Sequence, residues 1–289
     1  MSLVNCPLYS SKGDEDRAIA DYSVAIKLNP KDGSLVSNRA VSYTNKGEFD
    51  DALADYNEAI VIDPKNSLSY VNRGTTYYAK GDFDRAMADF KEAQRIDPKE
   101  VYIYFSRGQI LRARGDFDAA LADFNQELKV NPYKPQSFLG GILLQRGVTY
   151  LKAGALPKAL ADLSRAAALD PQNTWTALWL DIADRLSNLP SRLGEASKAI
   201  DGKLWPAAIV RLYLGQMTFE EVLAVANASE GLAKREMVYE ANFFYGESLL
   251  IHGDKDGARR LFEAAAADCP TIPPDRWGAE LELKALGGS

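Results

Sequence analysis

In the stretch NRGTTYYAKGDFDRAMADF, residues 72 to 90, apolar and helix-favouring residues recur with a period near four. That spacing places them on one face of an α-helix. A glycine interrupts the pattern midway, and the same arrangement of two helical segments around a turn returns along the chain. The pattern predicts an all-α protein made of short paired helices.

The helical pairs recur at a fixed interval of 34 residues, which is marked by four prolines. A small residue lies twelve positions before each proline, and three units have a glycine between the two helices. The prolines are Pro30, Pro64, Pro98 and Pro132, the alanines are Ala18, Ala52, Ala86 and Ala120, and the glycines are Gly47, Gly81 and Gly115. Glycine adopts the turn that ends the first helix, alanine lets the two helices approach, and proline ends the second helix.

This arrangement resembles the tetratricopeptide repeat, a helix-turn-helix unit of 34 residues. The resemblance implies a right-handed α-α superhelix, a solenoid in which neighbouring repeats bury a continuous core. The register predicts a partial repeat at 1–32, four units at 33–66, 67–100, 101–134 and 140–173, capping and connecting helices at 174–230, and a C-terminal unit with a capping helix at 233–289. The connecting region contains a capping-box signature, Thr218 with Glu221, and a turn-rich segment at 189–203.

The C-terminal third contains a further set of motif residues, which are Leu204, Trp205, Pro206, Ile209, Val210, Tyr213, Leu214, Gly215, Glu240, Asn242, Phe243 and Gly246. This set is similar to the NlpI family, which comprises bacterial envelope lipoproteins built from tetratricopeptide repeats, and the similarity covers about residues 203–286. It implies a homodimeric adaptor in the bacterial periplasm or envelope, which holds peptidoglycan hydrolases or a protease and catalyses nothing itself. The alternative is a cytoplasmic peptide-binding module. A signal peptide encoded upstream of Met1 would favour the envelope protein.

Charge and composition narrow the class of partner. The 289 residues carry a net charge of −6, and the isoelectric point near 5.1 disfavours binding to nucleic acid or acidic lipid. No apolar run reaches the roughly 20 residues that a transmembrane helix needs. No signal peptide is visible, and LVNC at residues 3–6 matches a lipobox only faintly. With this fold, we expect the partner to be a protein or an extended peptide.

The sequence offers little for catalysis. His252 is the only histidine and is expected at an exposed turn, and the two cysteines, Cys6 and Cys269, lie outside any metal-binding spacing. Neither a GxxxxGK[ST] loop nor a GxGxxG motif is present. The acids recur in register at the starts of second helices, where helix capping explains them better than catalysis. We predict a protein that is not an enzyme and has no catalytic residues, metal site or cofactor.

An arginine recurs in the first helix of each repeat, and an acid follows it sixteen residues later. The pairs are Arg39 with Asp55, Arg73 with Asp89, Arg107 with Asp123 and Arg146 with Asp162. The late repeat has Tyr245 and Leu261 at these positions, so both partners are lost together. This joint loss favours ion pairs that stabilise the stack, with Asp21 as a further partner for Arg39. A ligand-binding role for the arginines is the alternative.

In the repeat family, positions next to this arginine line the concave surface of the array. Those positions form two columns, Asn38, Asn72, Ser106 and Gln145, then Val41, Thr75, Gln109 and Val148. An aromatic and cationic patch would be added by Tyr78, Tyr102, Phe105 and Arg112. An asparagine amide can bridge to an extended peptide because it offers both a donor and an acceptor. We predict protein or peptide binding at this surface, and solvation of a polar groove is the alternative.

Overall fold

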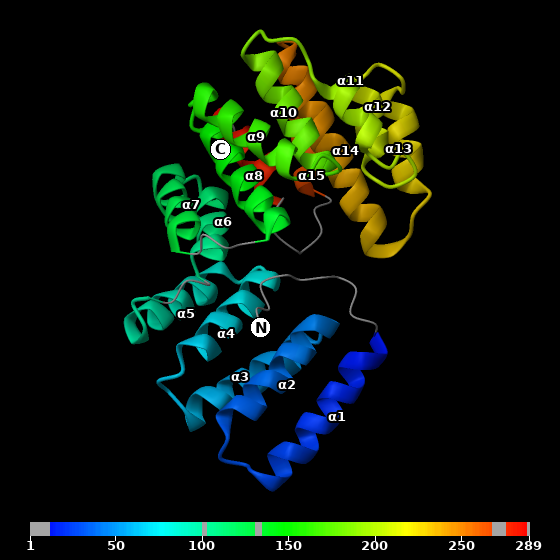
Figure 1. The fold of residues 1–289 in the computed structure, drawn as a ribbon. Helices are drawn as coiled ribbons and strands as arrows, with labels where there is room; N and C mark the ends of the chain where they lie inside the picture. Colours follow the sequence, from blue (N-terminus) through cyan, green and yellow to red (C-terminus); the bar gives the residue numbers. More distant parts are fainter. Residues whose placement is uncertain (1–11, 100–102, 131–134, 268–275, 288–289) are drawn as a thin grey trace. The chain divides into compact units, whose positions relative to one another are not determined.

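The computed structural model describes residues 12–99, 103–130, 135–267 and 276–287, and over these ranges every regular element is a helix (Figure 1). The elements are α1 (Lys12–Leu28), α2 (Gly33–Lys46), α3 (Phe49–Ile62), α4 (Ser67–Ala79), α5 (Phe83–Ile96), α6 (Tyr104–Ala113), α7 (Phe117–Val130), α8 (Gln136–Lys152), α9 (Leu156–Leu169), α10 (Thr174–Leu186), α11 (Leu193–Ala196), η1 (Ser197–Ala199), α12 (Ala207–Tyr213), α13 (Phe219–Asn227), α14 (Gly231–Ile251), α15 (Lys255–Ala267) and α16 (Arg276–Ala285). The predicted all-α solenoid is confirmed. None of the described helices is long and apolar enough to cross a bilayer.

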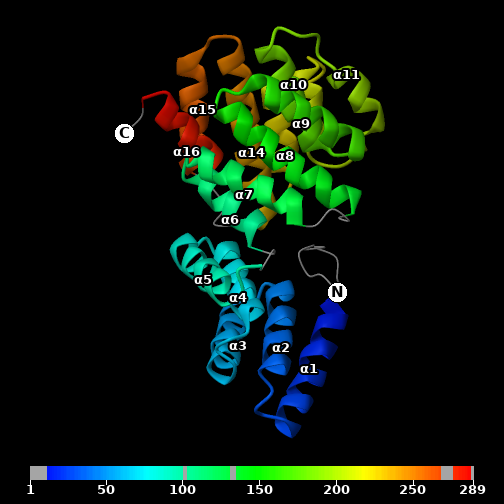
Figure 2. The same cartoon turned by 60° about the vertical axis from the view of Figure 1, so that its left-hand side comes forward.

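The chain divides into two compact units, Met1–Arg107 and Gly108–Ser289, and the division falls inside α6. In the first unit, α2 packs on α3, α4 packs on α5, and α1 packs on α2. In the second unit, α8 packs on α9 and α14 packs on α15, while α10 contacts α9, α12 and α14. Figures 1 and 2 show these pairs as helical hairpins with short turns.

The turn inside the pairs is closed by glycine in the left-handed region. Gly47, Gly81 and Gly115 have φ angles of 79°, 79° and 82°. A residue with a side chain pays roughly 1–2 kcal/mol for this conformation. The N–H of Gly47 donates to the carbonyl of Thr44 at 3.0 Å, which satisfies one of the last carbonyl groups of α2. The predicted role of these glycines is confirmed.

The acids at the start of the second helices lie where they were predicted. Helix α5 is capped by Asp82, which accepts from the N–H of Arg85 at 3.1 Å, and Asp84 lies in the first turn, at the positive end of the helix dipole. The turn-rich segment 189–203 contains the short helices α11 and η1. It is ordered this way because Leu193 is buried in the core of the second unit. By contrast, the capping box of Thr218 and Glu221 forms as predicted.

A large side chain from each second helix fills the space inside its pair. Phe90, Phe124 and Phe262 are fully buried, and Leu163 occupies the equivalent place in α9. A glycine in the facing first helix allows this close approach. A Cβ added to Gly147 would lie only 2.8 Å from Cγ of Leu163, so the two helices of this pair pack at a distance that glycine alone permits.

Two glycines of α8 test this packing against each other. We expect Gly147→Ala to lower the free energy of unfolding by about 1–3 kcal/mol, because the buried Leu163 cannot move aside. Gly141→Ala is the matched control: nothing lies within 4 Å of an added Cβ there, so the change should stabilise the helix by about 0.5–1 kcal/mol. Urea denaturation of both variants measures the difference, and equal effects would contradict the packing described.

Candidate functional site

Arg39, Arg73 and Arg146 form the predicted ion pairs within their own repeats. Each of these guanidinium groups donates through two nitrogens to both carboxylate oxygens of one aspartate. The Nε and Nη2 distances are 2.7 and 2.8 Å for Arg39 to Asp55, 2.8 and 2.7 Å for Arg73 to Asp89, and 2.6 and 2.7 Å for Arg146 to Asp162. The arginine and aspartate side chains of these pairs are largely buried. Partial burial and bidentate geometry make such pairs stronger than exposed ones.

The third nitrogen of each guanidinium reaches the second helix of the preceding repeat. Its partners are Ser23 for Arg39 at 3.1 Å, Asn57 for Arg73 at 2.7 Å and Asn125 for Arg146 at 2.6 Å. Asp21 is therefore not the partner of Arg39, because Ser23, two residues further along α1, takes that position. Every one of these guanidinium groups joins two consecutive repeats.

Arg107 also contacts the second helix of the preceding repeat, but through a residue at a different position. The position that holds Asn57 one repeat earlier is occupied by Lys91, whose ammonium group cannot accept a hydrogen bond. Nη1 of Arg107 instead donates to Oε1 of Gln94 at 2.8 Å. Asp123 belongs to the second compact unit, so its pairing with Arg107 stays a prediction.

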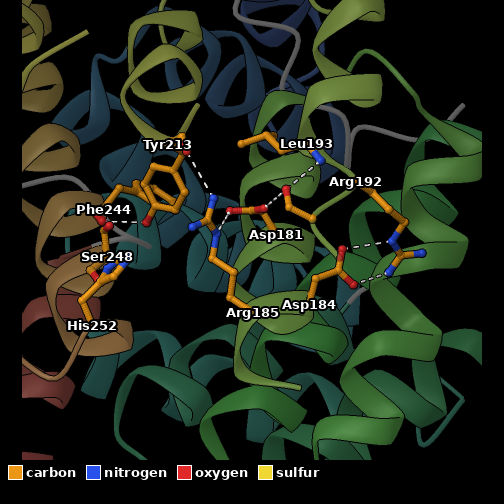
Figure 3. Close-up of polar contacts among 10 residues, drawn as sticks. Asp181, Asp184, Arg185, Arg192, Leu193, Tyr213, Phe244, Ser248 and His252 are labelled. Atoms are coloured by element: carbon orange, nitrogen blue, oxygen red, sulfur yellow. Dashed lines mark hydrogen bonds and ion pairs between the residues drawn. The ribbon is translucent and has the colours of Figure 1, made fainter. Parts of the chain in front are cut away.

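An arginine outside the repeat register, Arg192, continues this pattern in the second unit, and Figure 3 shows its pair with Asp184. Leu180 occupies the arginine position of α10, but Arg192 donates to both carboxylate oxygens of Asp184 at 3.0 and 2.7 Å. Its third nitrogen reaches Ser164 on α9 at 3.0 Å, at the position equivalent to Ser23. The sequence register missed this residue because it comes from the loop after the helix.

The late repeat replaces the ion pair with an aromatic contact. Tyr245 stands in the arginine column and stacks on Phe219 of α13, with ring centroids 4.4 Å apart and planes 20° from parallel. The joint loss of arginine and acid thus has a structural reason, since an aromatic ring needs no carboxylate.

The second unit contains a cavity of about 150 Å³. It is lined by residues from α6, α8 and α14, which are first helices of helical pairs, and from α10 and α16. The aromatic residues of its wall are Trp175, Trp179, Tyr239, Phe243 and Phe244, and its polar residues are Arg112, Gln145, Lys152 and Glu240. An apolar cavity with a few polar groups is the usual form of a ligand site.

The aromatic wall is held by contacts among its own rings. Trp175 stacks on Phe244 with centroids 5.4 Å apart, and Trp179 meets the edge of the same ring at 5.5 Å. Phe243 lies almost perpendicular to Phe244, at 87° and 5.3 Å. Offset and edge-on geometries are the favoured ones for aromatic pairs. The wall is therefore preorganised without a ligand.

A buried charge cluster lies at one side of the cavity. Nζ of Lys152 is 2.7 Å from a carboxylate oxygen of Glu247 and 2.5 Å from one of Glu282, and it lies 5.1 Å from the ring centroid of Trp179. Burial raises the pKa of Glu247 to about 7, although Lys152 pulls it down. Burial alone would lower the pKa of Lys152, but the two carboxylates outweigh it and raise that pKa.

Two of the predicted binding residues, Arg112 and Gln145, line this cavity together, with Val148 from the second predicted column. Arg112 is 7% exposed, and its Nε has no hydrogen-bond partner among the described residues. Gln145 is half-buried. Gln109, also on α6, is buried and does not line the cavity.

The other predicted binding residues lie in the first unit. Asn38 is exposed on α2, Asn72 is half-buried on α4, and Tyr78 packs edge-on against Phe83 with centroids 5.7 Å apart. Phe105 is half-buried and Ser106 is buried, both on α6. Tyr102 falls outside the described residues. Their predicted role in binding stays a prediction.

Sequence reasoning missed most of the cavity. Lys152 and Glu247 are 95 residues apart and belong to no repeating column. A usable signal was present in the spacing of Trp175 and Trp179, which places two large aromatic side chains on one face of a helix. A glutamate inside the apolar stretch of α14 was a second signal, because a buried acid needs a partner.

The described part of the chain contains no cluster of metal-ligating side chains, and the surroundings of His252 do not indicate a catalytic site. His252 is exposed at the end of α14, and its Nδ1 lies 2.7 Å from the carbonyl oxygen of Ser248 (Figure 3). No group of three or more His, Cys, Asp or Glu side chains gathers there in a metal-binding arrangement. Both cysteines fall outside the described residues.

The repeat geometry agrees with comparisons to known families. Models of the tetratricopeptide repeat match residues 8–32, 41–81, 71–135 and 223–273, which together make up more than half of the chain. The chain belongs to the tetratricopeptide repeat family. Arrays of this family form binding surfaces for other proteins, and this chain is a protein-interaction scaffold of that class.

Solved structures of the same fold are similar over much of the chain. YrrB, a tetratricopeptide repeat protein with an unusual peptide-binding site, has a TM-score of 0.53 and 19% identity, over 68% of this chain and 98% of its own. The human IFIT1 dimer with PPP-AAAA has a TM-score of 0.55 and 14% identity, over 88% and 68%. PilW, a type IV pilus biogenesis factor, has a TM-score of 0.50 and 20% identity, over 81% and 92%. At these identities the likeness concerns the fold alone, and the similarity to the NlpI family stays a prediction.

Arg192 provides a test of the continued ladder. Asp184 is 1% exposed, so Arg192→Ala would leave a buried carboxylate without its two strongest donors. We expect the free energy of unfolding to fall by about 1–3 kcal/mol. Lys198→Ala is the control in the same segment: its pair with Glu195 is exposed, at 72% and 79%, and removing it should change stability little. Similar losses for the two variants in urea denaturation would contradict the role of Arg192.

The charge cluster predicts a pH dependence of stability. Because the pKa of Glu247 is raised to about 7, the folded state binds this proton more tightly than the unfolded chain does. The contribution of Glu247 is therefore fully present below about pH 4.5 and is lost as the pH rises through about 7. Relative to Glu247→Gln, we expect the wild-type protein to lose about 3 kcal/mol of unfolding free energy across that range. Urea denaturation at a series of pH values measures this, with exposed Glu263→Gln as control, and parallel profiles for Glu247→Gln and the wild type would refute the raised pKa.

Proposed function

We propose that this protein is a non-catalytic adaptor that binds an extended segment of a partner protein in the cavity of the second unit. The supporting observation is the position of that cavity among α6, α8 and α14, which are first helices of their pairs, and α10. In solenoids of this family those helices form the extended binding surface. Large aromatic side chains and a small number of polar groups suit a cavity that anchors a side chain and orients the backbone beside it.

In the first unit, we propose that Asn38 and Asn72 contribute hydrogen bonds to the partner. Neither side-chain amide is engaged by another described residue, and both residues stand on first helices, α2 and α4. An amide can donate and accept along the backbone of an extended chain. The arginines beside them are occupied by aspartates, so the asparagines are better candidates for ligand contact.

For the cellular setting, we propose an envelope adaptor similar to the NlpI family, with a cytoplasmic peptide-binding module as the alternative. Two of the residues that carry the similarity contact each other here, since Nε1 of Trp205 donates to Glu240 at 2.5 Å. A third, Tyr213, donates its hydroxyl to the carbonyl of Phe244 at 2.6 Å. They hold α12 against α14. Fractionation of cells that express the gene with its native upstream sequence separates the two settings.

Site-specific photo-cross-linking tests the binding surface. We expect Gln145→p-benzoylphenylalanine and Asn72→p-benzoylphenylalanine to cross-link one and the same protein in cells, because both positions lie on first helices. Glu263→p-benzoylphenylalanine is the control, since this exposed residue lies on α15, a second helix. Mass spectrometry identifies the products. Cross-links from position 263 alone would show that the binding surface has been misplaced.

A further inference from the structure

The second unit contains another cavity, of about 260 Å³, on the opposite face of α10 from the aromatic wall. The aromatic cavity takes Trp175 and Trp179 from this helix, whereas the other cavity takes Ala177, Leu180 and Asp181. At 3.6 residues per turn these two sets point to opposite sides of the helix. The two cavities have no lining residue in common.

This outer cavity lies between α10, the turn that joins α9 to α10, and the short helices α11 and η1. Because α11 and η1 belong to the connecting region at 174–230, the cavity is a feature of this chain and not of the repeat unit. It opens to solvent, since Pro171, Glu195 and Ala199 in its wall are exposed.

The floor of the outer cavity is apolar. Leu180 and Leu193 are buried there, and the remaining apolar wall comes from alanines, whose small side chains leave the space open. The volume exceeds the roughly 150 Å³ of an engineered apolar cavity that holds benzene in another protein. The outer cavity can therefore admit a long side chain.

Two charged groups in the wall of the outer cavity are neutralised within the fold, as Figure 3 shows. Arg192 donates to both carboxylate oxygens of Asp184, and Asp181 accepts from Nε of Arg185 at 2.6 Å and from the hydroxyl of Ser191. A ligand would have to displace these internal partners. The remaining charged groups of the wall are two carboxylates, from Asp170 and Glu195.

The carboxylate of Asp170 has lost the partner that its equivalents have in the first unit. Oδ1 of Asp63 accepts from the N–H of Lys65 at 3.1 Å, and Oδ1 of Asp97 accepts from the N–H of Lys99 at 2.9 Å. Asp170 holds the same position before the proline of its repeat, but its carboxylate makes no hydrogen bond or ion pair with a described residue. It is therefore available to a ligand.

Two more polar groups of the wall can also turn to a ligand. Glu195 pairs with Lys198 at 2.5 Å, but both side chains are largely exposed, and such a pair is weak and easily exchanged. Oδ1 of Asn173 accepts from the N–H of Thr176 at 2.9 Å, while its Nδ2 donates to no described residue. The wall thus offers two acceptors for a cation and one donor for a carbonyl oxygen.

We propose that the outer cavity is a second docking site, which takes one arginine side chain of a partner protein. The methylene groups lie on the apolar floor, the guanidinium pairs with Asp170 and Glu195, and Nδ2 of Asn173 donates to a carbonyl beside the arginine. Long basic side chains bury an apolar stem and keep the charge at the surface. A guanidinium is more weakly hydrated than an ammonium and matches carboxylates in geometry. No residue of the aromatic cavity takes part, so this site stands or falls independently of the proposed function.

Four ligands test the site on the full, ¹⁵N-labelled chain by NMR titration, followed at the amides of Leu193 and Ala196. They are acetyl-Gly-Gly-Arg-Gly-Gly-amide, the same peptide with citrulline or with lysine in place of arginine, and butylguanidinium. We expect the arginine peptide to bind at least about fivefold more tightly than each of the others. Equal binding of the citrulline peptide would show that the charge is not recognised, and equal binding of the lysine peptide would show that any cation suffices. Equal binding of butylguanidinium would mean a site for small cations. Each of these results, or no binding of the arginine peptide, overturns the proposal.

Protein variants locate the docked side chain. Asp170→Asn should weaken binding of the arginine peptide about fivefold and leave the citrulline peptide unchanged, without lowering the thermal midpoint, because no internal contact is lost. Asp63→Asn is the matched control, since it removes the same charge at the equivalent position of the first unit. Ala199→Trp should fill the exposed mouth of the cavity and abolish binding, whereas Ala168→Trp, at an exposed position of α9 outside the wall, should not. Wild-type binding by Asp170→Asn or by Ala199→Trp overturns the proposal.

Discussion

The guanidinium group shared by two consecutive repeats is the interaction on which the stack depends. Arg73 holds Asp89 of its own repeat with two nitrogens and reaches Asn57 of the preceding repeat with the third. A planar fork with fixed donor directions can satisfy both only when the first helix sits in one register between its two neighbours. Apolar packing supplies most of the stability of such an array, but it is tolerant of sliding. The directional contacts select a single arrangement.

Where the repeat lacks the arginine, another residue makes the contact between neighbouring helices. The contact is therefore kept although the residue that makes it changes. Where α10 has Leu180 in the arginine column, Arg192 arrives from the following loop and joins Asp184 to Ser164. Where the late repeat has Tyr245, Phe219 of the inserted helix α13 stacks on it. The irregular connecting region, residues 174–230, therefore has a structural role. It replaces the missing contacts and so lets the array continue to α14 and α15.

Features that repeat along the chain could be predicted from the sequence, and features that occur once could not. Prolines, turn glycines and the arginine–aspartate columns recur, so a single chain contains several copies of each signal, and the helices and ion pairs follow. The cavity has no such copies. Lys152 meets Glu247 across 95 residues, and Arg192 substitutes from a loop, so neither contact has a register from which it could be predicted. Gln145 was found because it belongs to a predicted column, and Arg112 because it lies close to one, whereas the aromatic wall of the cavity was not found.

The cations that meet carboxylates within the fold belong to the scaffold of this molecule. The arginines of the ladder, Arg192 and Lys152 each meet carboxylates supplied by the fold, so a ligand that approached them would have to displace an internal partner. Arg112 is buried to a similar degree, but its Nε meets no acceptor among the described residues. The conspicuous column of cations thus belongs to the architecture, because its charges are already satisfied by carboxylates of the fold.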